Sequence, residues 1–130
     1  MTLGATQIQA IVDATKTPTA EQVRVVEAPR RPLLVVAGAG SGKTETMSMR
    51  VLWLLANHPD LTPASILGLT FTRKAAGELG DRLRERIRLL SRELPQMRER
   101  LDEDPVTLTY NSFAERIVSE HGMRIGIDPD

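Results

Sequence analysis

Short apolar runs alternate along the chain with longer stretches in which apolar residues are spaced by three or four. The short runs are rich in leucine and β-branched residues and predict three buried strands, at residues 33–37, 66–71 and 106–110. The longer stretches predict three helices, at residues 42–56, at residues 73–90 and from residue 111 or 112 onward. This alternation predicts an α/β fold in which a parallel sheet carries helices on both faces.

Each predicted helix has one apolar face that should point into the core. For the three later helices these faces are Met47, Val51, Leu54 and Leu55; Ala75, Ala76, Leu79, Leu83, Ile87 and Leu90; and Phe113, Ile117 and Val118. Two short helices precede the first strand. Their inner faces are Ile8, Ile11 and Val12 for residues 7–14, and Ala20, Val23 and Val26 for a second helix capped by Thr19.

The first predicted strand leads into a glycine-rich segment, Ala37, Gly38, Ala39, Gly40, Ser41, Gly42, Lys43 and Thr44. Glycines let the backbone wrap around an anion, and a helix that begins near Gly42 directs its positive end at the same anion. Lys43 can reach the β and γ phosphates of a nucleotide, and the Thr44 hydroxyl can ligate Mg²⁺. A strand-to-helix turn with an incidental lysine is the alternative, but the full pattern favours a nucleotide site.

Ligands of parallel sheets collect at the edge where the strands end. Three segments each follow a predicted strand: residues 37–44, which we call the phosphate loop, the segment after Thr70 and the segment after Thr109. We therefore expect all three segments at one edge, with Phe71 and Asn111 on the same side of the sheet as the phosphate loop.

The composition is that of a globular protein with one core. The 130 residues are 41% apolar and 26% charged, and the longest apolar run is far too short to cross a membrane. The length suits a single domain. The absence of cysteine excludes disulfides and thiolate metal sites and agrees with a cytoplasmic location.

Charge gives only a weak argument about partners. Seventeen basic residues balance seventeen acidic ones, although residues 73–100 hold nine Lys or Arg against five acids and residues 101–130 hold seven acids against two arginines. From charge alone, a solvated helix face is a better interpretation of the basic segment than a DNA-binding surface.

Four segments resemble, in order, motifs of the UvrD/PcrA/Rep group of superfamily 1 DNA helicases. PTAEQ, which ends at Gln22, resembles the Q motif, and AGAGSGKT resembles motif I, where alanine commonly takes the first position. TFTRKAAGEL at residues 70–79 resembles motif Ia, and TYNSF at residues 109–113 resembles motif Ib. The joint match is far more specific than any one motif. Three segments are also similar to AdnAB-type helicase–nucleases of actinobacteria: residues 45–55, the motif Ia segment and residues 115–127.

The resemblance implies the RecA-like fold of a P-loop NTPase. It divides the chain into an N-terminal extension (1–18), an incomplete ATP-binding domain 1A (19–121) and a tail (122–130) that leads toward an inserted subdomain. The implied cofactors are ATP and Mg²⁺, with Gln22 on the adenine, Lys43 on the phosphates and Thr44 on the magnesium. Contacts with single-stranded DNA are implied for five residues, Phe71, Thr72, Arg73, Tyr110 and Asn111.

For the whole protein, the resemblance implies a 3′-to-5′ DNA helicase or helicase–nuclease of repair or recombination. Such a protein would be cytoplasmic, associated with the nucleoid and outside the membrane. Its partners would be single-stranded DNA, further domains of the same chain and, for a helicase–nuclease, a second subunit. Within the 130 residues no predicted strand ends in the paired Asp-Glu of motif II, and there is no second RecA-like domain, so we expect them to be inactive alone.

Three residues depart from the family pattern. Glu45 stands where many relatives have an arginine that packs on the adenine, Arg73 replaces a common asparagine, and Asn111 replaces the usual histidine. These changes leave adenine recognition resting more on Gln22 and put the individual DNA contacts in doubt.

Phe71 and Tyr110 each have two interpretations. An aromatic residue at the end of a buried strand is commonly part of the core, whereas the family stacks bases on an aromatic residue at the position of Phe71. The motif match favours stacking for Phe71 and leaves Tyr110 open. Two other functions also stay open, a small-molecule kinase and a nucleotide-binding module without turnover.

Overall fold

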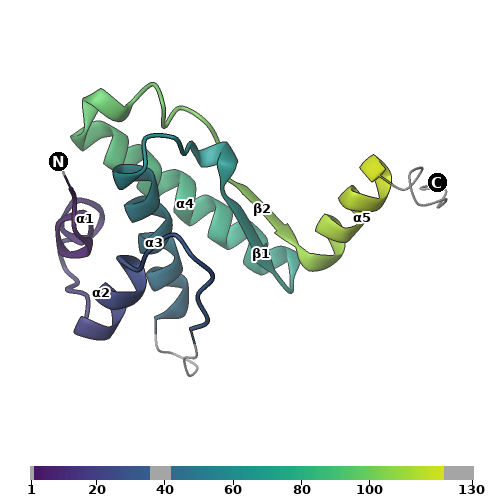
Figure 1. Ribbon diagram of the computed structural model, residues 1–130, viewed down its shortest axis with the longest axis horizontal. Helices are drawn as coiled ribbons and strands as arrows, with labels where there is room; N and C mark the ends of the chain where they lie inside the picture. The colour runs from purple at the N-terminus through teal and green to yellow at the C-terminus, as the bar shows by residue number, and fades with distance from the viewer. Residues whose placement is uncertain (1, 36–41, 122–130) are drawn as a thin grey trace.

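The computed structural model describes residues 2–35 and 42–121 of the chain (Figure 1). The elements in chain order are α1 (Ala5–Val12), α2 (Ala20–Val26), α3 (Lys43–Asn57), the 3₁₀ turn η1 (Pro63–Ser65), β1 (Leu67–Thr70), α4 (Arg73–Glu93), the 3₁₀ turn η2 (Pro95–Met97), β2 (Val106–Thr109) and α5 (Tyr110–His121). The predicted helices, and the second and third predicted strands, are confirmed with shifts of a few residues at their ends.

Strands β1 and β2 form a parallel two-stranded sheet. Leu67 pairs with Val106 and Thr70 pairs with Thr109, so the two strands end level with each other. Helix α4 connects them and packs against both (Figure 1). Among the described residues, α4 is the helix that lies along this sheet, so the predicted helical layer on the second face is not formed there.

The core lies between helices α1, α2, α3 and α4. Its most deeply buried large side chains are Ile8, Val26, Leu52, Leu55, Leu83 and Leu90. The apolar face predicted for α4 is confirmed, because all of its members are buried except the half-buried Ala75. Helix α2 contributes Val26 and the half-buried Val23 to the core. The prediction that Ala20 faces the core is wrong, because this residue of the first turn is exposed.

The buried face of α3 differs from the predicted one. Its buried residues are Ser48, Met49, Leu52, Leu55 and Ala56. Of the predicted face only Leu55 is buried, while Val51 and Leu54 are half-buried and Met47 is 48% exposed. The helix carries two apolar stripes, and α1, α2 and α4 pack against the stripe that the prediction missed.

The predicted strand at residues 33–37 is wrong for the part that the structure describes. Leu33, Leu34 and Val35 are not in a strand and are 52%, 86% and 46% exposed. A strand exists only where a neighbouring strand pairs its backbone N–H and C=O groups. Neither of the described strands pairs with this segment, because β1 and β2 form a sheet of two strands only. Val36 and Ala37 lie outside the described residues.

Helix α5 extends away from the other helices (Figure 1). None of its residues is buried: Phe113 and Val118 are half-buried and Ile117 is 44% exposed. The prediction that these three residues face a core is therefore wrong. The described elements against which α5 packs are the two strands that it follows, and they contact only its beginning.

Helix α4 approaches β2 closely because residue 80 is glycine. A Cβ at Gly80 would lie only 2.7 Å from Thr107 Oγ1. Gly77, on the exposed side of the same helix, has no heavy atom within 4 Å of the corresponding position.

We expect Gly77→Ala to raise the free energy of unfolding and Gly80→Ala to lower it. Alanine gains up to about 1 kcal/mol over glycine inside a helix, and this gain applies at both positions. At Gly80 the added methyl group must displace Thr107 or the helix itself, and such overpacking costs about 1–3 kcal/mol. Urea unfolding of both variants measures the difference. Equal stabilisation by the two alanines would show that Thr107 yields easily.

Candidate functional site

Gly42 begins the described part of the phosphate loop. Ala37, Gly38, Ala39, Gly40 and Ser41 lie outside the described residues, so their predicted phosphate contacts stay predictions. Gly42 is the N-cap of α3 with φ of 81°, in the left-handed region that favours glycine. The backbone N–H groups of the first helical turn and the positive end of the helix dipole lie at this residue. Lys43 and Thr44 follow as the first two residues of α3, and both are exposed.

Gln22 lies beside this helix start. Its Oε1 accepts a hydrogen bond of 2.9 Å from the Thr19 backbone N–H, and its own backbone N–H donates to Thr19 Oγ1 at 3.1 Å. This capping box fixes the side chain against the first turn of α2. A Cβ added to Gly42 would lie 3.3 Å from Gln22 Nε2. The side-chain amide N–H groups are therefore directed to the start of α3.

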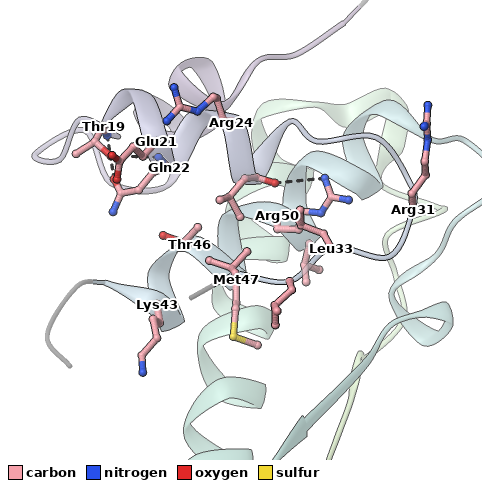
Figure 2. Close-up of a pocket in the computed structure, with 14 residues that line it drawn as sticks. Thr19, Glu21, Gln22, Arg24, Arg31, Leu33, Lys43, Thr46, Met47 and Arg50 are labelled. Carbon is pink, nitrogen blue, oxygen red and sulfur yellow. Dashed lines mark hydrogen bonds between the residues drawn. The ribbon is translucent and has the colours of Figure 1, made fainter. Parts of the chain in front are cut away.

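A groove of about 930 Å³ runs between α2, α3 and the segment before the phosphate loop. Figure 2 shows Gln22 and Lys43 toward one end of it and Arg50 and Leu33 toward the other. The walls combine apolar side chains from all three segments with four cationic ones, Arg24, Arg31, Lys43 and Arg50. Such a groove suits a ligand with a flat apolar part and an anionic part.

Arg50 joins α3 to the end of α2, a role that the sequence did not predict. Its guanidinium donates hydrogen bonds to the carbonyl oxygens of Val26 at 3.1 Å, Pro29 at 3.0 Å and Ala28. It also lies 5.6 Å from the ring centroid of Trp53. Burial lowers the pKa of Arg50 from its ordinary value. The available signal was a single arginine within an otherwise apolar stretch of α3.

The predicted motif Ia and Ib segments meet at one edge of the sheet. Phe71 directly follows β1 and Tyr110 directly follows β2, and their ring centroids are 5.1 Å apart with the planes tilted by 37°. Phe71 is 89% exposed and Tyr110 is 49% exposed. Phe71 is therefore not packed into the core of the described residues. We call this exposed pair the aromatic edge.

The polar residues predicted to contact DNA surround the aromatic edge. Thr72 caps α4 by accepting a 3.0 Å hydrogen bond from the Ala75 backbone N–H, and Arg73 is the first residue of that helix. Arg73 and Asn111 are both exposed. Parallel pairing of the strands confirms that Phe71 and Asn111 share one edge. Whether the phosphate loop lies on the same side of the sheet depends on residues outside the described ranges and stays a prediction.

Glu45 is directed away from the groove. Its carboxylate accepts hydrogen bonds from Arg82 at 3.1 Å and from Arg86, both on α4. The carboxylate therefore cannot take over the adenine contact of the arginine that many relatives have here. The sequence identified Glu45 as a departure from the pattern but gave no signal for its two partners.

Two other kinds of feature are not found in the described part of the chain. Within residues 2–35 and 42–121, no three His, Cys, Asp or Glu side chains are grouped so that they could hold a metal ion. No described helix is long and apolar enough to span a membrane.

Comparison with known families identifies the family to which the motifs belong. The family model of the UvrD/REP helicase N-terminal domain matches residues 18–130. The chain belongs to this family. The match confirms the resemblance drawn from the four motifs. Helix α1 lies before residue 18 and so outside the matched region.

Individual members of the family cover most of the chain. The ATP-dependent DNA helicase PcrA of Staphylococcus aureus is 34% identical over 110 residues, which are 83% of this chain and 13% of that protein. DNA helicase IV of Escherichia coli is 37% identical over 106 residues, 82% of this chain and 14% of the helicase. One subunit of the ATP-dependent helicase/nuclease of Streptococcus sanguinis is 32% identical over 130 residues, 94% of this chain and 10% of that relative. The chain therefore spans only a small part of the length of these relatives.

Proposed function

We propose that this chain is the N-terminal ATP-binding part of an ATP-dependent DNA helicase or helicase–nuclease of repair or recombination. In the whole protein, ATP binding and hydrolysis would drive 3′-to-5′ movement along single-stranded DNA. The observation that carries the proposal is the aromatic edge, because an 89% exposed phenylalanine in contact with a tyrosine has no role in the described core. Family membership and the named activities of PcrA and DNA helicase IV support it.

On the nucleotide side, the proposal assigns three residues. Lys43 holds the β and γ phosphates as a point charge, and the amide N–H groups of Gln22 are available to acceptor atoms of the adenine. Thr44 fits a magnesium ligand, because its hydroxyl is exposed and has no hydrogen-bond partner among the described residues. Bound magnesium would neutralise phosphate charge, while the chain's own residues orient the nucleotide.

On the DNA side, Phe71 and Tyr110 offer stacking surfaces that accept any base. Arg73, at the start of α4, adds a cation close to the path of the phosphate backbone. Stacking without base-specific hydrogen bonds suits a protein that moves along DNA regardless of sequence. A helicase–nuclease would also have a second protein partner.

The two rival functions lack a comparable observation. A small-molecule kinase needs an acceptor pocket and an arginine-rich lid, and it gives no reason for exposed aromatic side chains at the ends of both strands. A nucleotide-binding module without turnover describes the 130 residues in isolation, because neither described strand ends in the Asp-Glu pair of motif II.

Nucleotide binding is the first test. We expect the 130-residue chain to bind Mg²⁺-ATP or Mg²⁺-ADP weakly and Lys43→Ala to weaken binding by about tenfold or more, since a charged hydrogen-bond donor to phosphate is lost. Calorimetry measures both affinities. Lys16→Ala is the matched control, because Lys16 is a 58% exposed lysine outside the groove. Equal affinities for the unsubstituted chain and Lys43→Ala would contradict the assignment.

Turnover is the second test. We expect no useful ATP hydrolysis by the purified 130-residue chain, with or without single-stranded DNA, because neither described strand ends in the motif II carboxylates that activate water and no second domain supplies arginines. The full-length protein should hydrolyse ATP faster when DNA is added. DNA-stimulated hydrolysis by the short chain, abolished by Lys43→Ala, would show that the site is complete without these groups.

A further inference from the structure

Glu45 forms an ion-pair network between the first turn of α3 and the middle of α4. Its Oε2 accepts a hydrogen bond from Arg82 at 3.1 Å, and its Oε1 accepts one from Arg86. The side chains of Glu45 and Arg86 are only 15% and 12% exposed. Solvent screens such shielded charges less than charges at an open surface. The network therefore fixes the position of the first turn of α3 relative to α4, although β1 lies between the two helices in the sequence.

The network connects the two candidate sites. Glu45 directly follows Thr44, the proposed magnesium ligand. Arg82 and Arg86 belong to α4, a continuous helix of 21 residues that begins two positions after Phe71. A helix moves largely as one stiff body, because its backbone hydrogen bonds are internal to it. The ion pairs and α4 thus form a continuous physical connection from the first turn of α3 to the start of α4, beside the aromatic edge.

The charges also account for the departure from the family pattern. An arginine at position 45 would bring three guanidinium groups together, and like charges at this separation disfavour one another. A glutamate neutralises part of this charge and stabilises the start of α3, because a negative side chain in the first turn of a helix interacts favourably with its dipole. Residue 45 is therefore matched to Arg82 and Arg86 rather than to the nucleotide base.

We propose that Glu45 is a positioning residue that couples nucleotide binding to DNA binding. The inference rests on the proposed function, since it presumes both ligands. Glu45 touches neither of them; it fixes the first turn of α3 relative to α4, so that occupation of one site changes the affinity of the other. By thermodynamic linkage, DNA must change nucleotide affinity by the same factor.

The test compares affinities in the full-length protein. The affinity for a labelled single-stranded oligonucleotide is measured with and without a non-hydrolysable ATP analogue, and the ratio of the two values is the coupling. Glu45→Gln keeps the shape of the side chain and removes its charge. Coupled sites typically give a ratio of about fivefold or more, and we expect Glu45→Gln to bring this ratio close to one. The affinity for the analogue without DNA should stay within about twofold of the unsubstituted value.

Two further variants control for a general structural effect. Glu85→Gln removes an exposed acid of α4 that forms no ion pair within the described ranges, and it should leave the coupling ratio unchanged. Arg82→Gln removes the more exposed partner, which is 41% exposed, and leaves the pair between Glu45 and Arg86. It should reduce the ratio by a smaller factor, and it carries the test if Glu45→Gln does not fold.

The outcomes separate the inference from the function on which it rests. An unchanged ratio in a folded Glu45 or Arg82 variant overturns the inference. The inference is also overturned if a Glu45 or Arg82 variant loses nucleotide affinity, DNA affinity and melting temperature together, because such a result indicates that the ion pair only stabilises the fold. Failure of the unsubstituted full-length protein to bind nucleotide or DNA rejects the proposed function itself.

Discussion

Ile8→Ala is expected to lower the free energy of unfolding by about 2–5 kcal/mol, the range for truncating a fully buried aliphatic side chain. Ile8 is 0% exposed, and its helix α1 packs against α3 and α4. The surrounding helices cannot easily collapse into the space, because α1 is also fixed at its start. The Leu3 backbone N–H donates to Asn57 Oδ1 at 2.9 Å, and the Ala5 backbone N–H donates to Glu27 Oε2 at 2.7 Å.

This expectation concerns a helix that precedes the family match, which begins at residue 18. Urea unfolding of Ile8→Ala and Ile117→Ala provides the comparison. Ile117 is 44% exposed on α5, so its truncation should change stability by less than about 0.5 kcal/mol. Similar small losses for both variants would show that α1 is an accessory attached to a core that is stable without it.

The sequence predicted best those elements whose partners are close in the chain. Residues 66–110 form a strand, a helix and a second strand, and α4 packs on both strands as well as on α1 and α3. The face of α4 was predicted almost residue by residue, because its outer surface is charged and leaves only one apolar stripe. The meeting of Phe71 and Tyr110 also followed from parallel pairing of the two strands.

Elsewhere the local pattern was ambiguous or depended on distant partners. Helix α3 has two apolar stripes, and periodicity alone cannot show which of them meets α1 and α4. Leu33 to Val35 has the composition of a buried strand, but pairing requires a neighbouring strand, and β1 and β2 do not provide one. Helix α5 has an apolar stripe that the described elements cover only in part.

The candidate sites divide in the same way. Gly42, Lys43 and Phe71 could be identified as candidate site residues, because their chemistry requires particular residue types within short motifs. The roles of Arg50 and of the pair Arg82 and Arg86 could not, because each depends on a contact with a residue more than 20 positions away. Charged residues on a helix are commonly solvated, so only the structure shows which ones connect two helices.

Phe71→Ala in the full-length protein is expected to weaken single-stranded DNA binding by about 1–3 kcal/mol, the contribution of stacking one base. This loss corresponds to about 5–150-fold in the dissociation constant. DNA-stimulated ATP hydrolysis should fall as well, whereas ATP binding without DNA should not change, because Phe71 is not among the residues that line the nucleotide groove. Fluorescence anisotropy at a fixed salt concentration measures the DNA affinity.

Thermal melting distinguishes loss of a stacking surface from damage to the fold. Phe71 is 89% exposed and its aromatic contact is with Tyr110, so Phe71→Ala should leave the melting temperature almost unchanged. Phe71→Trp is the matched control, because it retains an aromatic surface and should preserve DNA affinity. A large loss of melting temperature, accompanied by weakened ATP binding, would mean that Phe71 supports the fold of the whole domain. In that case the DNA surface would have to be sought among the neighbouring polar residues Thr72, Arg73 and Asn111.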